Sequence, residues 1–359
     1  MDKTKLKSLL IPRDTTIKQA MQKLNTNAEK ILFVVDEEVK LLGTITDGDI
    51  RRGLINGLEF NNEVEKIMHQ GFIAVRSDTP EVDDHVKQLM IKNKIEQVPV
   101  LDDKKRIVDV ILWIDVLGER KPPESKKLHQ NYVVIMAGGK GSRLDPFTKI
   151  LPKPLIPINN KPVIEIIMER FYQCGFHKFI YTLNYKKEYI KLFLRENKFP
   201  YIIDWVEEDD FLGTAGSLAL LKGKIKETFF VVNCDSILDV NFQEILDWHR
   251  EHEAAMTIIG CHNEVKIPFG VLHLSNGRLE KILEKPVHDV VINTGVYIME
   301  PHIISYISEG SQIDMNKLID IVAKKEKISV FPIYGGWFDI GQWDEYKKSI
   351  GKLGCLENE

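Results

Sequence analysis

The chain has 359 residues, of which 43% are hydrophobic and 28% are charged, and its formal net charge is -4. These values predict a globular protein of two or three domains with a sizeable core. Because no long basic block is present, they argue against nucleic acid or an anionic membrane surface as the main partner. No apolar run approaches the roughly 20 residues needed to cross a bilayer.

The N-terminus and the cysteines give an expectation for the compartment. The first seven residues carry three lysines and lack the apolar core of a signal peptide. The four cysteines are far apart and show no paired metal-binding spacing. They are Cys174, Cys234, Cys261 and Cys355. We therefore expect reduced thiols in a cytoplasmic protein.

The first 120 residues contain an internal repeat. A helical pattern opens at residues 14–17 and is followed by two strand-like apolar runs; the same order returns roughly 65 residues later, from residues 78–80. The strand runs are 31–36 and 41–46 in the first copy and 98–102 and 107–112 in the second. A duplication of this kind predicts two like units that bury a shared face.

The repeat resembles a tandem pair of CBS motifs, which together form one α+β module, over roughly residues 5–120. In such modules a Ser or Thr, followed three residues later by an Asp, commonly grips ribose hydroxyls. The first copy has this pair as Thr46 and Asp49. The second has Leu112 in place of the Thr and keeps Asp115. The resemblance implies one adenine-nucleotide effector site or, alternatively, a structural or dimer-forming role, and a homo-oligomer.

The segment 118–131 contains Lys-Pro-Pro-Glu-Ser-Lys-Lys, which does not easily continue a helix and is typical of a linker. We therefore place a tandem CBS pair at 1–120, a linker at 121–131 and a second domain at 132–359. From residue 132 strands alternate with longer helices, which predicts a Rossmann-like α/β domain with a mostly parallel sheet. The expected helices are 163–172, 187–196 and one beginning at 216–221, and the expected strands are 178–183, 202–206 and 229–233.

A glycine-rich turn follows the apolar run 133–137. Its sequence is Gly138-Gly139-Lys140-Gly141-Ser142-Arg143-Leu144. Glycines let backbone N–H groups approach a polyphosphate closely, and Arg143 and Lys153 supply positive charge for its oxygens. The turn is not a Walker A loop, because no Gly-Lys-Ser/Thr closes it. It is not a dinucleotide fingerprint either, because Leu144 stands where the last glycine is required.

An acidic residue follows the second long apolar run. Asp235 follows strand 229–233 after one intervening residue, Cys234, at the edge of the sheet where ligands of α/β folds bind. A carboxylate there suits Mg²⁺, which prefers oxygen ligands and usually takes one or two carboxylates plus substrate phosphates. Taken alone, Asp235 is more simply a surface residue in a strand-to-loop turn.

The whole string from Ala137 to Pro146, with Pro152-Lys153-Pro154 behind it, resembles the signature of the sugar-1-phosphate nucleotidyltransferases. Further segments of that family occur here in the same order: Leu-Gly-Thr-Ala-Gly at 212–216, Glu-Lys-Pro at 284–286, Asn-x-Gly-x-Tyr at 293–297 and Trp-x-Asp-Ile-Gly at 337–341. The chain departs from the family at Cys234, where a glycine is common, and at Gln342-Trp343, where many members have Thr-Pro.

The resemblance implies a set of site residues. The nucleotide would be bound by Gly138, Gly139, Gly141, Ser142, Arg143, Gly213 and Thr214. The sugar phosphate would be bound by Gly270, Glu284, Lys285 and Asn293. Asp235 and Asp339 would hold Mg²⁺, and Arg143, Lys153 and both aspartates would carry the catalysis.

The resemblance also implies a reaction. A sugar 1-phosphate would attack the α-phosphorus of a nucleoside triphosphate and release pyrophosphate. The form of the glycine-rich turn favours GTP. A CBS pair ahead of this domain resembles the guanylyltransferases of bacterial legionaminic acid synthesis, which implies glucosamine 1-phosphate. The alternatives are mannose 1-phosphate, a heptose 1-phosphate, or a CBS-mediated nucleotide sensor with a degenerate transferase domain.

Overall fold

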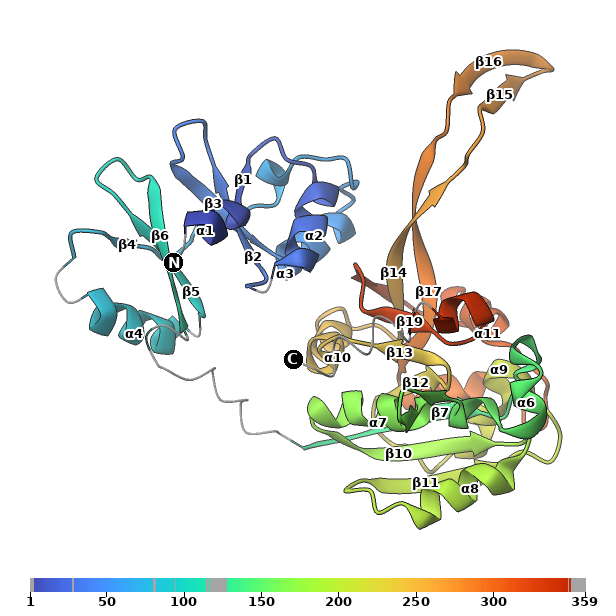
Figure 1. Ribbon diagram of the computed structural model, residues 1–359. Coiled ribbons are helices and arrows are strands. Elements are labelled where there is room, and N and C mark those ends of the chain that lie inside the picture. The colour runs from blue at the N-terminus through green and yellow to red at the C-terminus, as the bar shows by residue number, and fades with distance from the viewer. Residues whose placement is uncertain are drawn as a thin grey trace. The chain divides into compact units, whose positions relative to one another are not determined.

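The computed structural model describes residues 3–27, 29–79, 82–93, 95–113, 116, 128–347 and 349. The chain divides into two compact units, 1–125 and 126–359 (Figure 1). Within the described ranges, every helix is too short or too polar to span a lipid bilayer.

The first unit holds two small sheets of the same design. Each has three strands in chain order, the first pair parallel and the second pair antiparallel. The strands are β1 (Leu10–Pro12), β2 (Ile31–Val35) and β3 (Leu41–Thr46) in one sheet, and β4 (Val75–Arg76), β5 (Gln97–Leu101) and β6 (Ile107–Leu112) in the other. The helices are α1 (Lys3–Leu9), α2 (Ile17–Thr26), α3 (Asp47–Ile55), α4 (Val82–Asn93) and the 3-10 turn η1 (Val64–Lys66). The predicted repeat is confirmed.

The two copies bury a shared face, as the repeat predicts. Phe33 and Leu41 of the first copy and Val110 and Leu112 of the second belong to one apolar cluster. Backbone hydrogen bonds join the copies beside this cluster: Leu41 N–H donates to the Lys105 carbonyl at 3.1 Å, and an equivalent bond runs from Ile107 to Val39 at 3.1 Å. Neither copy could bury its apolar face alone, which is why the pair forms one unit.

The second unit is built on a seven-stranded sheet with the order β11-β10-β7-β12-β17-β14-β18 (Figure 1). Its strands are β7 (His129–Ala137), β10 (Phe176–Leu183), β11 (Ile202–Glu207), β12 (Phe229–Asn233), β14 (Met256–Lys266), β17 (Val287–Met299) and β18 (Ile328–Ile333). Four of the six pairings are parallel, and β17 is antiparallel to both its neighbours. The predicted mostly parallel sheet is confirmed.

Both faces of this sheet are covered. Alternate residues of β7 enter different apolar clusters: Val133 and Ile135 lie in one, and Val134 and Met136 in the other. Burial on both faces explains why the strands read as continuous apolar runs. The helices are α6 (Phe147–Ile150), α7 (Val163–Gln173), α8 (Lys187–Glu196), α9 (Gly213–Gly216), α10 (Phe242–Glu251) and α11 (Met315–Ala323). The 3-10 turns are η2 (Ser142–Leu144), η3 (Lys153–Leu155), η4 (Ser217–Leu221) and η5 (Pro301–Tyr306).

The prediction of a helix beginning at 216–221 is corrected by the structure. The structure begins it three residues earlier, as the single turn α9, and continues it as the 3-10 turn η4. Gly213 starts the turn with a φ of 79°, a left-handed conformation that glycine adopts without strain. A side chain at Gly213 or Gly216 would meet the backbone carbonyls of Ile313 or Ser311 at 2.6 Å, so these glycines let the segment pack closely.

Three two-stranded sheets complete the second unit. They are β8 (Pro157–Ile158) with β9 (Lys161–Pro162), β13 (Ser236–Leu238) with β19 (Trp337–Asp339), and β15 (Val271–Ser275) with β16 (Arg278–Leu283). The last of these caps a long extension of β14 and β17 that projects from the sheet (Figure 1). We refer to residues 260–293 as the ribbon.

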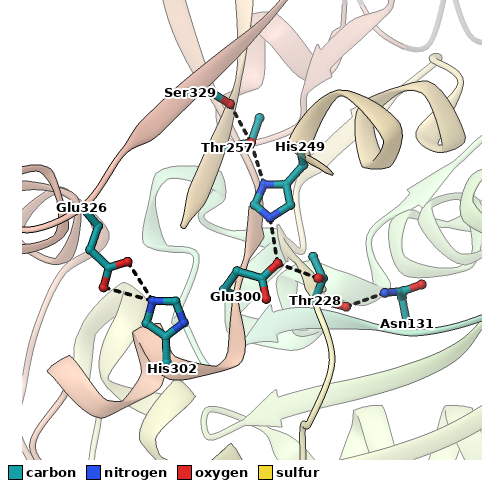
Figure 2. A network of polar contacts seen from close by, with 8 residues as sticks. All are labelled: Asn131, Thr228, His249, Thr257, Glu300, His302, Glu326 and Ser329. Atoms are coloured by element: carbon teal, nitrogen blue, oxygen red, sulfur yellow. Dashed lines mark hydrogen bonds and ion pairs between the residues drawn. The ribbon is translucent and has the colours of Figure 1, made fainter. Parts of the chain in front are cut away.

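A network of polar contacts lies at the end of the sheet where β12 begins (Figure 2). His249, only 1% exposed, lies between the Thr257 hydroxyl at 2.7 Å and the Glu300 carboxylate at 3.1 Å. The Thr228 hydroxyl donates to the same carboxylate at 2.6 Å. Asn131 donates to the Thr228 carbonyl at 2.7 Å. The buried histidine therefore has a partner for each ring nitrogen, and the network ties α10 to β7, to β14 and to the residues that flank β12 and β17.

Candidate active site

A cavity of about 470 Å³ opens at the carboxyl ends of β7 and β12. This volume suits a small-molecule ligand. Every residue predicted to bind the nucleotide lines it, as do Lys153 and Asp235. The two strands deliver their following loops to one edge of the sheet because they are parallel neighbours, with Asn233 opposite Met136.

The glycine-rich turn is shaped by close contacts that leave no room for side chains. Gly141 has a φ of 67°, and a Cβ there would lie 2.9 Å from the Lys153 Cβ and 3.0 Å from the Thr148 side chain. A Cβ at Gly138 would lie 2.6 Å from the Glu208 carboxylate. Because they have no side chain, these two glycines let the turn run close to Lys153 and to Glu208.

Lys153 and Asp235 form an ion pair inside the cavity wall. Lys153 is 9% exposed and its ammonium contacts the Asp235 carboxylate. The lysine sits in η3 between Pro152 and Pro154, whose fixed φ angles hold the backbone at this point. A largely buried charge needs a partner, and each of these two groups supplies the other.

The structure brings Asp339 beside Asp235, although 104 positions separate them in the chain. Strand β13 pairs with β19 so that Ser236 lies opposite Asp339, and Ile340 N–H donates to the Asp235 carbonyl at 2.9 Å. A Cβ at Gly341 would lie 2.7 Å from Asp339 Oδ1 and 3.0 Å from Asp235 Oδ2. The two carboxylates therefore converge on a space that only a glycine leaves open.

The electrostatics of this pair favour a cation. Burial raises the pKa of Asp339, and the negative charge of Asp235 raises it further, while the Gly341 N–H, Lys153 and Arg143 oppose the shift. Like charges held this close disfavour each other's ionised form. Two oxygen-donor carboxylates that converge on one open space fit a divalent cation of the hard, oxygen-preferring kind.

The predicted sugar residue Asn293 lies at the base of the ribbon, next to the cavity. Its amide donates to the Tyr297 hydroxyl at 2.9 Å and accepts from Gly295 N–H at 3.0 Å. Gly295, with a φ of 77°, packs against the side chain of Asn233, which lines the cavity. Asn293 is thus linked to the predicted nucleotide site through the backbone of Gly295 and the side chain of Asn233.

The other predicted sugar residues are not brought to the cavity. Gly270, Glu284 and Lys285 are exposed on the ribbon and do not line the cavity. The reason is the register: β14 pairs with β17 from Gly260↔Asn293 to Lys266↔Val287. At about 3.3 Å per residue, this carries Val287 about 20 Å along the strand from Asn293. The expected set therefore divides into Asn293 at the base and three residues farther out.

Thr214 lines the cavity, but its hydroxyl already has two partners. It accepts from Met315 N–H at 2.8 Å and lies 3.4 Å from the Asp314 carboxylate. The Thr214 N–H donates to the same carboxylate at 3.2 Å. These bonds fasten α9 to the start of α11. They also orient the Thr214 hydroxyl at the cavity wall, and its contact with a nucleotide stays a prediction.

Sequence reasoning missed Glu208, Phe211 and Asn233, which also line the cavity. Glu208 follows β11 directly and Asn233 ends β12. The rule that ligands bind beyond the carboxyl ends of parallel strands, applied to every strand, would have found both.

In the first CBS copy, Thr46 and Asp49 contact each other. The Asp49 carboxylate accepts from the Thr46 hydroxyl at 2.7 Å and from the Thr46 N–H at 2.8 Å, and its other oxygen accepts from Arg52 at 2.5 Å. The carboxylate thus closes the first turn of α3. Asp115 lies outside the described residues.

Comparisons with known proteins identify the family. Residues 132–353 match the nucleotidyl transferase family, and residues 6–56 and 64–121 match the CBS domain. The chain belongs to the nucleotidyl transferase family. The predicted fold class and family are confirmed, and the CBS prediction is confirmed for both copies.

The relatives are guanyltransferases by name. The mannose-1-phosphate guanyltransferase of Hypocrea jecorina is 36% identical over 242 residues, covering 62% of this chain and 66% of that protein. The enzyme of the same name from Candida albicans is 32% identical over 219 residues, covering 58% of this chain and 60% of that protein. The chain thus spans slightly less than two thirds of the length of these curated relatives.

Solved structures agree with the fold. HddC from Yersinia pseudotuberculosis is 26% identical, with a TM-score of 0.51, and the match covers 62% of this chain and 99% of HddC. A second HddC structure, complexed with GMP-PN, matches with a TM-score of 0.50.

Proposed function

We propose that this protein transfers GMP from GTP to a sugar 1-phosphate and releases pyrophosphate. The observation that carries the proposal is the ion pair of Lys153 with Asp235 in the cavity wall beside the glycine-rich turn, with Asp339 held against Asp235. The names of the curated relatives and the GMP-PN complex of HddC support guanine as the base.

The reaction needs alignment and charge neutralisation, because both reactants are anions. An oxygen of the sugar 1-phosphate forms a bond to the α-phosphorus, and the bond from that phosphorus to the pyrophosphate oxygen breaks. Arg143 would bind the departing pyrophosphate, and Lys153 would offset the charge that develops at the α-phosphate. Backbone N–H groups of the glycine-rich turn would hold the triphosphate in line.

Asp235 and Asp339 would hold Mg²⁺, whose positive charge polarises phosphate oxygens when it is bound. Before substrate enters, Lys153 neutralises Asp235. A bound triphosphate offers Lys153 a second anionic partner, so the lysine is positioned to contact the α-phosphate without a large movement.

For the sugar, we propose glucosamine 1-phosphate, the substrate that a CBS pair ahead of the transferase domain implies, with a role in legionaminic acid synthesis. The names of the relatives support mannose 1-phosphate as the second candidate, and a heptose 1-phosphate remains the third. The sites that would contact the sugar are Asn293 and, if the ribbon bends, Gly270, Glu284 and Lys285.

The test is pyrophosphate release by the purified full chain with Mg²⁺. GTP, CTP, UTP, dTTP and ATP are crossed with the 1-phosphates of glucosamine, mannose, glucose and a heptose. We expect a peak with GTP and glucosamine 1-phosphate. A peak with GTP and another sugar corrects the sugar alone, a peak with another nucleotide overturns the base, and no release with any pair overturns the proposed activity.

A second proposal concerns the CBS pair, which we propose binds an adenine nucleotide at Thr46 and Asp49. ATP or AMP should raise the melting temperature of the full chain, and Asp49→Ala should abolish this shift. No shift at millimolar nucleotide would leave the pair a structural role.

We also propose a homo-oligomer. A light-scattering mass of one chain, 41.4 kDa, would contradict it.

A further inference from the structure

A histidine–aspartate pair lies at the base of the ribbon, on the edge of the sheet that carries the cavity. Strand β17 is antiparallel to both β12 and β14, so β12 and β14 run in the same direction and end at the same edge. His262 comes directly after Cys261, the last residue of β14 that pairs with β18. Its Nε2 lies 3.0 Å from the Asp289 carboxylate of β17. The proposed reaction assigns no task to this pair.

The pair is far less exposed than the outer part of the ribbon. The side chains of His262 and Asp289 are 11% and 16% exposed, whereas Leu272 and Leu274 farther out are more than half exposed. The ring of Tyr334, which follows β18, lies 6.3 Å from the His262 ring. Removing polar and charged groups from water is unfavourable unless they are paired. An ordered, largely buried carboxylate at the edge where ligands bind therefore needs an explanation.

His262, Asp289 and Asn293 lie on one face of the ribbon. Gly260 pairs with Asn293 and His262 pairs with Val291, and side chains two positions apart along a strand point to the same face. Two residues at about 3.3 Å each place His262 roughly 7 Å farther along the ribbon than Asn293. Asn293 is the residue of the predicted sugar site that lies next to the cavity. The pair therefore extends this face by about the width of a sugar ring.

The direction of the proposed reaction leads the acceptor sugar to this part of the edge. The cavity lining follows β7, β11 and β12, and the strand order puts β17 and β14 on the other side of β12. In an in-line displacement the nucleophile arrives opposite the leaving group. With the pyrophosphate on the side of the glycine-rich turn, the sugar 1-phosphate arrives from the side of β17 and β14. Two strand spacings of about 4.8 Å place β14 roughly 10 Å from β12.

The charges on this face favour a cationic substituent on the sugar. Glu264 lies opposite Asp289 across the ribbon, so two carboxylates share the face with His262, and Lys266 is exposed one position farther out. A protonated amine carries a positive charge and three N–H donors. Its hydrogen bonds to a carboxylate are about twice as strong as those of a neutral hydroxyl. Glucosamine has an amine at C2, where glucose and mannose have a hydroxyl.

We propose that the Asp289 carboxylate, oriented by His262, binds the ammonium group of an amino-sugar 1-phosphate and selects it over a neutral sugar. This inference rests on the proposed function and adds a residue that determines the class of sugar. A carboxylate only accepts hydrogen bonds, so His262 Nε2 donates to Asp289 Oδ1 and sets the orientation of the carboxylate. His262 is thus a positioning residue.

The test compares glucosamine 1-phosphate with glucose 1-phosphate, which differ only at C2, in the presence of GTP and Mg²⁺. The wild type should favour glucosamine 1-phosphate in kcat/KM by about 10- to 100-fold, the contribution of a hydrogen bond between charged groups. Asp289→Asn should bring this ratio to within about threefold of one. The change should come from a higher KM for glucosamine 1-phosphate, with the KM of GTP unchanged. His262→Gln should lower the ratio less than Asp289→Asn does.

The preference should also depend on pH in the wild type. As the pH rises through the pKa of the sugar amine, the ammonium loses its charge, and the ratio of the two kcat/KM values should fall. Effects of pH on the phosphates and on the protein's other groups cancel in the ratio, because both sugars share them. In Asp289→Asn the ratio should not change with pH. A purely structural role of the pair would not produce this difference.

Glu280→Gln is the matched control. It removes the same charge from the same ribbon, but Glu280 is exposed on β16, far from the base. This variant should keep the wild-type ratio and its dependence on pH.

Asp289→Asn protein that folds and keeps the wild-type ratio would reduce the pair to a structural contact at the ribbon base, while the proposed guanylyl transfer would stand. A wild-type ratio near one, or one that does not change with pH, would also overturn the inference, even if the variants fail to fold. Wild-type protein that uses no GTP with any sugar 1-phosphate would instead overturn the proposed function.

Discussion

Two regions carry residues that the family resemblance assigns to one reaction. One is the ribbon, and the other, which we call the rim of the cavity, holds Lys153, Asp235 and Asp339. The two regions differ in how these residues are held in place. At the rim, Asp235 pairs with Lys153, and Asp339 lies against Asp235 through the β13–β19 pairing. On the ribbon, Glu284 and Lys285 are exposed. Parallel strands end at the same edge of a sheet, so the residues that follow them lie close together. In a hairpin, by contrast, the position of a residue depends on the pairing register of its two strands.

The ribbon also differs from the rest of the unit in its packing. Leu272 and Ile282 face each other across β15 and β16, as do Leu274 and Leu279, and all four are more than half exposed. A two-stranded hairpin is marginally stable by itself in water. The sheet, in contrast, buries both its faces. We therefore expect substitutions in these two regions to differ in kind as well as in size.

The largest effect should follow Asp235→Asn, which removes a carboxylate charge from the rim. Loss of a charge that positions and stabilises the transition state should lower kcat by about 10³-fold or more. The fold should survive, because the amide keeps the size and can still bond Lys153. Pyrophosphate release and the melting temperature measure the two effects.

Asp239→Asn is the matched control for that variant. Asp239 lies just beyond β13 and pairs with Arg170 at 3.0 Å, away from the cavity lining. It should keep nearly full activity. Near-normal turnover by Asp235→Asn would remove this residue from the proposed mechanism.

The second prediction compares the packing of the two regions directly. Phe230 is fully buried in β12 and contacts the rings of Phe171, Phe176 and Phe242. Phe230→Ala should lower the free energy of unfolding by about 3–5 kcal/mol. Leu274→Ala, on the ribbon and 63% exposed, should change it by less than about 0.5 kcal/mol. Urea unfolding of both variants measures the difference, and a large loss from Leu274→Ala would show that the ribbon face is covered in solution.

The third prediction asks whether the ribbon takes part in turnover. The family resemblance assigns Lys285 to the incoming phosphate, whereas the structure holds it away from the cavity. We expect Lys285→Ala to raise the KM of the sugar 1-phosphate about tenfold, the worth of one charge-assisted bond, and to leave the KM of GTP unchanged. Such a result would mean that the ribbon bends toward the cavity. Unchanged KM values for both substrates would keep the two regions separate.

The smallest effect concerns the polar network at the opposite end of the sheet (Figure 2). The hydrogen bond from His249 lowers the pKa of Glu300, and the Thr228 hydroxyl adds to the shift. A carboxyl whose pKa is lower in the folded state stabilises the fold above its unfolded pKa of about 4.3, and this stability is lost as the pH falls through the folded value. The urea midpoint of wild type should therefore fall more steeply between pH 5 and 3 than that of Glu300→Gln.

Glu251→Gln, at the exposed end of α10, is the control for this pH dependence. It should follow the wild-type curve. Parallel curves for wild type and Glu300→Gln would show that the network does not contribute to acid sensitivity.

Local sequence was enough for much of this protein. The repeat, the strand at 229–233 and the helix at 187–196 have the predicted bounds or nearly so, because apolar periodicity and turn residues act over a few positions. The glycine-rich turn, Lys153 and Asp235 were found for a related reason. The turn and Asp235 follow strands, so the strand-end rule places them at one edge of the sheet. Lys153 was found from its charge and from the resemblance of its Pro-Lys-Pro segment to the family signature.

Only the tertiary structure decided which distant groups meet. The approach of Asp339 to Asp235 depends on the β13–β19 pairing, and the burial of Glu208 depends on the packing of its loop against Gly138. The separation of Lys285 from Asn293 depends on the register of β14 with β17. Sequence patterns report on neighbours along the chain, whereas contacts between distant segments are selected by the packing of the whole unit, which no single segment encodes.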